Sequence, residues 1–268
     1  MMNKRIFDET GIRADFFCSP SKKPKKAIIM LGGSEGGKSW SRIKKPVELL
    51  VQRGYALLSL AYFKSEGLPD TLEEIPLEYF DIAFDWLSSQ PGIVKDEYAI
   101  LGGSKGAEAA LLLGSRSSRV KAVIAFSPSN VIWQGIPADR FELSKDPKSS
   151  WSDGGVGLPF LLYSSSISKW DLRLLNLNKM HTSALQNAGR AKEAAIQVEK
   201  IKGAVLLISG KRDRLWPAAE MSEQIMGRLK AHDFIYPHEH LALEGGHNQI
   251  VMNKNSWRKI FDFLSAHF

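Results

Sequence analysis

Short apolar runs alternate along the chain with longer segments in which apolar residues recur every three or four positions. The short runs have the length of buried strands, and the longer segments have the periodicity of amphipathic helices. This alternation is typical of a mostly parallel sheet with helices on both faces, so the sequence predicts an α/β fold. Strands are expected at residues 27–31, 55–63, 97–101, 120–126, 204–209 and 234–243, with an opening hairpin at 5–8 and 13–19, and helices at 41–53, 77–88, 106–116, 218–230 and 256–266.

Residues 127–202 break this rhythm. They separate two predicted strands by more than a crossover helix needs, and long loops inside a compact domain are usually functional. We interpret the stretch as a small cap or lid over an active site, inserted into a single domain of residues 1–268. The alternative is a peripheral segment that does not contact substrate. The stretch carries four large aromatic residues among polar and glycine residues: Trp133, Trp151, Phe160 and Trp170.

The candidate nucleophile is Ser104. It stands at the centre of Gly102-Gly103-Ser104-Lys105-Gly106, which fits G-x-S-x-G. The bare pattern is common, but here a predicted strand precedes it and a predicted helix follows, which is the strand–turn–helix setting of a nucleophile elbow. Small neighbours permit the sharp turn that holds the hydroxyl above the sheet edge, and the helix N-terminus favours developing negative charge. A glycine-rich turn without chemistry is the alternative.

A serine hydroxyl needs a base to take its proton, and in this setting the chain order is serine, acid, histidine. Of the six histidines, only His247 lies in a loop directly after the last predicted strand. Asp213 is the one carboxylate between the strand at 204–209 and the next predicted helix. It would hold the His247 ring in the right tautomer and stabilise the imidazolium. The alternatives are a structural loop histidine and an aspartate that pairs with its arginine neighbours.

An oxyanion hole requires two backbone N–H groups. One should come from Lys105, the residue after the nucleophile, and the other from the glycine-rich loop at residues 32–37. We favour Ser34 in that loop, with Gly33 and Glu35 as alternatives. The loop lacks the Gly-Lys-Ser/Thr ending of a P-loop, so a nucleoside triphosphate site is not expected.

Composition limits the remaining function classes. An apolar fraction of 44% and a charged fraction of 24% are ordinary for a globular protein, and the single cysteine, Cys18, cannot form an internal disulfide. No apolar stretch has the length of a signal peptide or a membrane span, so we expect a cytoplasmic protein without a membrane partner. We expect no cofactor and no metal, and the sequence does not indicate the oligomeric state.

The net charge of +7 indicates either an anionic partner, such as a phosphorylated small molecule, or a generally basic surface. No zinc finger, RNA-recognition signature or stripe of aromatic and basic residues occurs, so we expect no nucleic acid partner.

The chain resembles the C-terminal catalytic domain of the acyl-CoA thioesterases and bile acid-CoA:amino acid N-acyltransferases, from about Lys26 to the C-terminus. The resemblance implies an α/β-hydrolase fold and the triad Ser104, Asp213 and His247. Animal members carry an N-terminal β-sandwich domain, which we do not expect in the short segment before the first matching strand. The similarity is carried by residues 32–37, 55–63, 68–69 and 77–80, by the elbow continued through Ala107-Glu108, and by Gly245-Gly246-His247.

The transferase relatives carry cysteine at the nucleophile position, whereas this chain has Ser104. An acyl-thioester intermediate reacts well with amines, while an acyl-serine ester is more easily left to water. We therefore expect hydrolysis of acyl-CoA thioesters through an acyl-serine intermediate. The alternatives are a general carboxylesterase, a dienelactone-hydrolase-like or peptidase-like hydrolase, with less support an acyl-CoA:amino acid N-acyltransferase, and a catalytically silent binding protein.

Coenzyme A carries a 3′-phosphate and a diphosphate, so an acyl-CoA substrate would need cations or helix N-termini near the pocket mouth. Each motif has basic neighbours that could serve, or could be solvated surface charges. These candidates are Lys38, Arg42, Lys44, Lys45, Lys105, Arg212 and Arg214.

Overall fold

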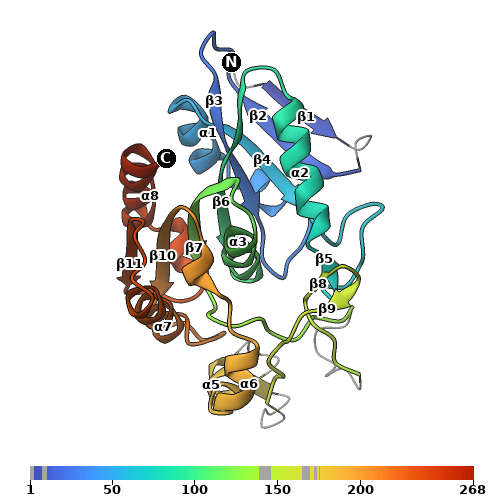
Figure 1. The fold of residues 1–268 in the computed structure, drawn as a ribbon, viewed down its shortest axis with the longest axis vertical. Coiled ribbons are helices and arrows are strands. Elements are labelled where there is room, and N and C mark those ends of the chain that lie inside the picture. The colour runs from blue at the N-terminus through green and yellow to red at the C-terminus, as the bar shows by residue number, and fades with distance from the viewer. Residues whose placement is uncertain (1–2, 8–10, 139–145, 165–169, 172–173, 175) are drawn as a thin grey trace.

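The computed structural model describes residues 3–7, 11–138, 146–164, 170–171, 174 and 176–268. An eight-stranded sheet runs in the order β1-β2-β4-β3-β6-β7-β10-β11 (Figure 1). The pairs β1–β2 and β2–β4 are antiparallel and each later pair is parallel, so the expected mostly parallel sheet is confirmed. The strands are β1 (Asn3–Phe7), β2 (Arg13–Cys18), β3 (Lys25–Leu31), β4 (Ala56–Ala61), β6 (Ile93–Gly103), β7 (Val120–Phe126), β10 (Ala204–Gly210) and β11 (His238–Leu243).

Helices cover both faces of the sheet because its strands are apolar on both sides. In β3, Ala27, Ile29 and Leu31 belong to one core, and Ile28 and Met30 belong to the other, as successive strand residues alternate. Among the described helices, none has the length and apolarity that a membrane crossing requires. The first core is closed by α2 (Glu78–Ser89), α3 (Lys105–Arg116) and α7 (Ala218–Ala231), and the second by α1 (Lys44–Gln52) and α8 (Lys254–His267).

Two expected elements have different boundaries in the structure. The helix expected at 41–53 is divided into the 3-10 turn η1 (Ser39–Arg42) and α1, which holds Pro46 in its first turn, where a helix does not use the missing N–H. The strand expected at 234–243 begins only at His238, because Pro237 has no N–H to donate to a ladder. In both places a proline sets the boundary.

The insertion at 127–202 contains regular elements that its sequence pattern did not predict. Its large aromatic residues divide: Trp133 and Trp151 are fully buried, whereas Trp170 is 71% exposed. A small third core packs the insertion against α7. Its elements are β8 (Trp151–Asp153) and β9 (Val156–Gly157), which join β5 (Ile75–Pro76) in a separate sheet, then α5 (Asn178–Leu185), α6 (Ala188–Glu193) and the 3-10 turn η2 (Val198–Lys200). Figure 1 shows α5 and α6 at one end of the molecule, whereas η2 packs against α3 and α7.

The carboxylate of Glu108, which forms a buried ion pair within helix α3, also binds the insertion. Lys105 Nζ lies 2.9 Å from both carboxylate oxygens of Glu108, and the two side chains are 2% and 0% exposed. Glu108 Oε1 also accepts hydrogen bonds from Trp151 Nε1 at 2.8 Å and from the backbone N–H of Trp133 at 3.2 Å. Burial raises the pKa of Glu108 and lowers that of Lys105, and each partner opposes the shift of the other. The pair therefore depends on both members.

Glu108→Gln should lower the free energy of unfolding by about 3–5 kcal/mol, because it leaves the Lys105 ammonium buried without a countercharge. The matched control is Glu97→Gln, which breaks the half-exposed Lys26–Glu97 pair and should cost less than about 1 kcal/mol. Urea denaturation of both variants measures the difference. Equal stability of the two variants would contradict a charged, structurally required pair.

Candidate active site

Ser104 lies at the turn from β6 to α3 with φ 56° and ψ −119°, a conformation rare for residues with a side chain. Glycines on either side make the turn possible. A Cβ on Gly102 would lie 2.0 Å from the carbonyl oxygen of Gly106, and a Cβ on Gly106 would lie 2.3 Å from that of Leu31. Backbone packing therefore requires the G-x-S-x-G pattern here, and strain of this kind is concentrated at functional sites.

The loops after β10 and β11 bring Asp213 and His247 together. His247 Nδ1 lies 2.7 Å from Asp213 Oδ2, and both side chains are buried. Asp213 Oδ1 accepts hydrogen bonds from the backbone N–H groups of Leu215 at 2.8 Å and Trp216 at 3.3 Å. These bonds orient the carboxylate towards the imidazole, and the contact favours the tautomer with the proton on Nδ1.

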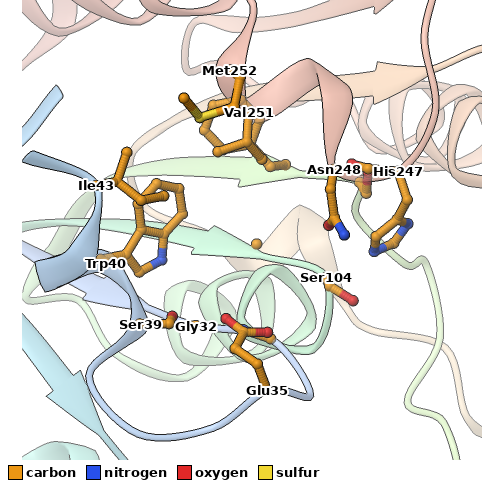
Figure 2. A pocket seen from close by; sticks show the side chains of 14 residues that line it. Gly32, Glu35, Ser39, Trp40, Ile43, Ser104, His247, Asn248, Val251 and Met252 are labelled. Atoms are coloured by element: carbon orange, nitrogen blue, oxygen red, sulfur yellow. The ribbon is translucent and has the colours of Figure 1, made fainter. Parts of the chain in front are cut away.

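The other ring nitrogen of His247, Nε2, has a different environment. Nε2 is buried and has no hydrogen-bond partner among the described residues, which is uncommon for a buried acceptor. Figure 2 shows the imidazole and the Ser104 side chain near each other at one end of a pocket that both line. The structure thus brings the sequence-predicted residues Ser104, Asp213 and His247 to one place, although they come from three separate loops.

Two aromatic side chains hold the glycine-rich loop after β3. Tyr62 donates its hydroxyl to the carbonyl oxygen of Gly32 at 2.6 Å. Trp40 donates its Nε1–H to the carbonyl oxygen of Leu31 at 2.8 Å. Both side chains are buried, so the loop backbone next to the nucleophile is fixed from beneath.

Of the residues considered for an oxyanion hole, Gly33 and Glu35 line the pocket, and Ser34 and Lys105 do not. Gly33 lines it, and a Cβ on Gly33 would lie 3.0 Å from Ser104 Cβ. Ser34, the residue favoured from the sequence, is not among the lining residues. Lys105 is the first residue of α3, where a backbone N–H has no acceptor within the helix.

The pocket beside Ser104 has a volume of about 350 Å³, within the range of small-molecule sites. Val251 and Met252 lie in the 3-10 turn η3 (Gln249–Met252), which follows His247 closely. Of the described residues in 127–202, Ser127 lines this pocket and the later ones do not. The apolar wall of the pocket beside Ser104 consists of Trp40, Ile43, Phe126, Val251 and Met252 (Figure 2).

A second pocket, of about 490 Å³, shares His247 and Asn248 with the first. It is the more basic of the two, because Arg212 and Arg214 line it. The insertion contributes Leu174 to its wall. The imidazole therefore borders an apolar pocket and a basic one.

The insertion also supports the loop that carries the acid. The backbone N–H groups of Leu177 and Asn178 both donate to the carbonyl oxygen of Arg214, at 2.8 and 2.9 Å. Asn178 Nδ2 donates to the carbonyl oxygen of Asp213 at 2.8 Å. The start of α5 thus holds the backbone of the acid and of the residue that follows it.

A row of aromatic rings connects the insertion to His247. His181 packs edge-on against Trp133 and Trp216, with ring centroids 4.6 and 5.7 Å apart, and Trp216 packs edge-on against His247 at 5.5 Å. Burial lowers the pKa of His181 to about 4. The ring is therefore neutral near pH 7, and it serves here as packing behind the catalytic candidate.

The basic residues near the motifs have different environments. The interpretation of Lys105 as a coenzyme A contact is wrong, because its ammonium is buried against Glu108. Lys38 Nζ lies 3.0 Å from Asp15. Arg42, Lys44 and Lys45 are exposed but line neither pocket, which leaves Arg212 and Arg214 as the candidates that line one.

A family model described as BAAT / Acyl-CoA thioester hydrolase C terminal matches residues 75–251, more than half of the chain. The chain belongs to this family. Mouse acyl-coenzyme A amino acid N-acyltransferase 2 is 30% identical over 237 residues, and human acyl-coenzyme A thioesterase 6 is 27% identical over 255 residues. These alignments cover 86% and 91% of this chain but 50% and 56% of the relatives, so the chain spans about half the length of the curated relatives it matches.

Solved structures share the fold at lower identity. An esterase from Pyrococcus furiosus has a TM-score of 0.63 at 17% identity, over 100% of this chain and 93% of that one. A dienelactone hydrolase from Anabaena variabilis has a TM-score of 0.56 at 14% identity, over 99% and 96%. The chain has the α/β-hydrolase fold. Its membership of the family supports an enzyme of the α/β-hydrolase type.

Sequence reasoning missed several residues that shape the site of this family member. Tyr62 and Trp40 fix the glycine loop, and Trp216 supports His247. One signal in the sequence could have indicated them. A tyrosine or tryptophan beside a catalytic motif usually hydrogen-bonds to a nearby group when its side chain is buried. Ile43 and Met252 had no signal, because an isolated apolar residue in a connecting segment is ordinary.

His181→Phe should flatten the pH dependence of stability between pH 6.5 and 4. In the wild type the unfolded chain takes up a proton near the ordinary pKa of 6.5, while the folded protein holds the ring neutral down to about 4. The free energy of unfolding therefore falls as the pH drops through this window, by up to about 3 kcal/mol. Phenylalanine removes that contribution and keeps a ring between Trp133 and Trp216.

Urea denaturation across this pH window measures the slope for the wild type, His181→Phe and the exposed control His232→Phe. The control should follow the wild type. A wild-type slope retained by His181→Phe would contradict the assignment to His181.

Proposed function

We propose that the chain is a serine hydrolase that cleaves acyl-CoA thioesters to a free acid and coenzyme A. The observation that supports it most is the environment of His247. Nδ1 lies 2.7 Å from Asp213, and Nε2 is buried without a partner among the described residues, next to Ser104 at a strained elbow. Ser104 Oγ does not hydrogen-bond to Nε2 in the free protein, and activation of the hydroxyl requires Oγ to turn to Nε2, a bond that in catalytic sites often forms only when substrate is present. Family membership supports acyl-CoA thioesters as the substrate class.

In the proposed reaction, Ser104 Oγ attacks the thioester carbonyl carbon while His247 Nε2 takes the hydroxyl proton. The C–S bond of the tetrahedral intermediate breaks, and the coenzyme A thiolate leaves with that proton. Ser104 then carries the acyl group as an ester. In the second half, His247 takes a proton from water, the oxygen of that water adds to the ester carbonyl, and Ser104 Oγ leaves with the proton.

Each charge that develops in this reaction would have a stabilising group beside it. Asp213 keeps the imidazole oriented and stabilises it when it is protonated. The oxyanion would be held by the N–H of Lys105 and by an N–H of the glycine loop. Because Gly33 lines the pocket against Ser104 and Ser34 does not line it, we favour Gly33 over Ser34 for the second N–H.

The two pockets suit the two ends of an acyl-CoA. The apolar wall beside Ser104 would receive the acyl chain, since burying its methylene groups is favourable. The second pocket would receive the coenzyme A moiety, with Arg212 and Arg214 near its phosphates. His247 borders both pockets, which is where a thioester between them would lie.

Acyl transfer to an amino acid is the second candidate, because curated relatives of similar identity are named as amino acid N-acyltransferases. Such an enzyme must protect its acyl intermediate from water until an amine arrives. An acyl-serine ester is less reactive towards amines than an acyl-cysteine thioester. The serine at position 104 therefore favours hydrolysis.

Ser104→Ala should reduce turnover of acyl-CoA thioesters by about 10⁴-fold or more without unfolding the protein, because it deletes the nucleophile and little volume. His247→Ala should be nearly as damaging, and Asp213→Asn should cost roughly 10²–10⁴-fold. The assay is thiol release from acyl-CoA esters of increasing chain length, with p-nitrophenyl esters in parallel.

Ser118→Ala, an exposed serine on the turn before β7, is the matched control and should retain wild-type turnover. A Ser104→Ala variant with substantial activity would contradict the elbow assignment. Formation of an amide with glycine or taurine in place of the free acid would favour acyl transfer over hydrolysis as the function.

KM for acyl-CoA should rise steeply with ionic strength, because exposed charges are screened within about 10 Å at ~0.1 M salt. KM for a short neutral ester should hardly change over the same range. Joint substitution Arg212→Gln/Arg214→Gln should raise KM for acyl-CoA and flatten its salt dependence. The matched control is Lys44→Gln/Lys45→Gln, which removes two exposed charges that line neither pocket. Flat salt curves for both substrates would favour a general esterase.

A further inference from the structure

The hydrogen bond from Tyr62 determines which way the peptide between Gly32 and Gly33 faces. The carbonyl oxygen of Gly32 accepts from the Tyr62 hydroxyl at 2.6 Å, and Tyr62 is only 2% exposed. The described chain has no cis peptide bond, and in a trans peptide C=O and N–H point in opposite directions. The N–H of Gly33 therefore points away from the core, towards the pocket that Gly33 lines.

The Glu35 carboxylate is the hydrogen-bond acceptor for this N–H in the structure. Gly33 N–H donates to Glu35 Oε1 at 2.9 Å. A Cβ built on Gly33 would lie 2.9 Å from Glu35 Oε2 and 3.0 Å from Ser104 Cβ, so the carboxylate and the nucleophile both adjoin the same glycine. In the proposed reaction this N–H serves the oxyanion. A carboxylate and an oxyanion are both negative, so they compete for one donor and repel each other.

The negative charge of Glu35 has little local compensation. The side chain is exposed, and within the described part of the chain its carboxylate has a hydrogen bond but no ion pair. Lys38, the next cation along the chain, lies 3.0 Å from Asp15 instead. Glu35 is also the one acidic side chain among the described residues that line the pocket. A second carboxylate entering this space would meet a fixed charge of the same sign.

We propose that Glu35 is a specificity-determining residue. In the free protein its carboxylate accepts a hydrogen bond from the Gly33 N–H. A substrate with a neutral apolar acyl group displaces the carboxylate from this N–H. An acyl group that ends in a carboxylate binds poorly, because the charge of Glu35 repels it. This rests on the proposed function, because it takes Ser104 as the nucleophile and Gly33 N–H as an oxyanion donor.

The first test compares hexanoyl-CoA with adipoyl-CoA, whose acyl groups have equal carbon numbers and differ in a terminal carboxylate. The wild type should strongly prefer hexanoyl-CoA. Glu35→Gln keeps an acceptor oxygen of the same shape and removes the charge. It should therefore lower the hexanoyl/adipoyl ratio of kcat/KM by at least about tenfold, mainly through a lower KM for adipoyl-CoA.

The second test follows the competition for the N–H directly. Glu35→Ala removes the acceptor, so the Gly33 N–H becomes free to bind the reagent oxygen. The rate at which a fluorophosphonate labels Ser104 should then rise about several-fold, because one oxyanion donor no longer has a competing acceptor. Glu48→Ala and Glu48→Gln are the controls, since Glu48 is exposed on α1 and does not line the pocket, and both should match the wild type.

The outcomes separate the two proposals. A wild-type protein that neither labels with the fluorophosphonate nor hydrolyses either thioester would refute the proposed function itself. If the wild type labels and hydrolyses, but Glu35→Gln keeps the substrate ratio and Glu35→Ala keeps the labelling rate, the role of Glu35 is refuted. Slower labelling of a fully folded Glu35→Ala, checked by its Tm, would also overturn it, because the carboxylate would then assist catalysis.

Discussion

The site depends on how closely helix α3 approaches the backbone that follows β3. At Gly106 an added Cβ would lie 2.3 Å from the carbonyl oxygen of Leu31 and 2.4 Å from that of Gly32. This contact seats the N-terminus of α3 beneath the glycine loop and brings Ser104 beside Gly33. Any side chain at position 106 would push the elbow and the loop apart by more than the tolerance of a hydrogen bond. Two segments that are distant in sequence therefore act as one rigid unit.

The same helix also binds the insertion. Glu108, one turn after the nucleophile, accepts hydrogen bonds from Trp133 and Trp151 and pairs with Lys105. A second attachment holds the Asp213 loop through Asn178. The insertion is therefore bound both to the nucleophile helix and to the loop of the acid, and it contributes to the site by holding these parts in place.

Most of the central sheet, its helices and the convergence of Ser104, Asp213 and His247 on one place could be predicted because they depend on local signals. Apolar runs mark buried strands, and functional loops follow the carboxyl ends of parallel strands. The strands of the insertion could not be predicted, because β8 and β9 are only three and two residues long, which leaves no periodicity, and β8 pairs with β5, which is distant in the chain.

Side-chain direction was the other limit. At a helix N-terminus, sequence does not show whether a lysine turns to solvent or into the core, and Lys105 turns inward because Glu108 three positions later provides a buried countercharge. Glu35 has the same ambiguity: its position in a glycine loop indicated a backbone role, whereas in the folded protein its carboxylate accepts a hydrogen bond from Gly33.

The composition of the apolar pocket has a consequence for how this site can be altered. Val251 and Met252 belong to η3, the short turn that begins two residues after His247, so changes to them act on the same segment that positions the candidate base. Ile43 lines the same pocket from the connection between η1 and α1, a segment that carries none of the three triad candidates. One wall of the pocket is therefore free to diverge while another is coupled to the chemistry. Engineering of acyl-chain preference has its most independent starting point at Ile43.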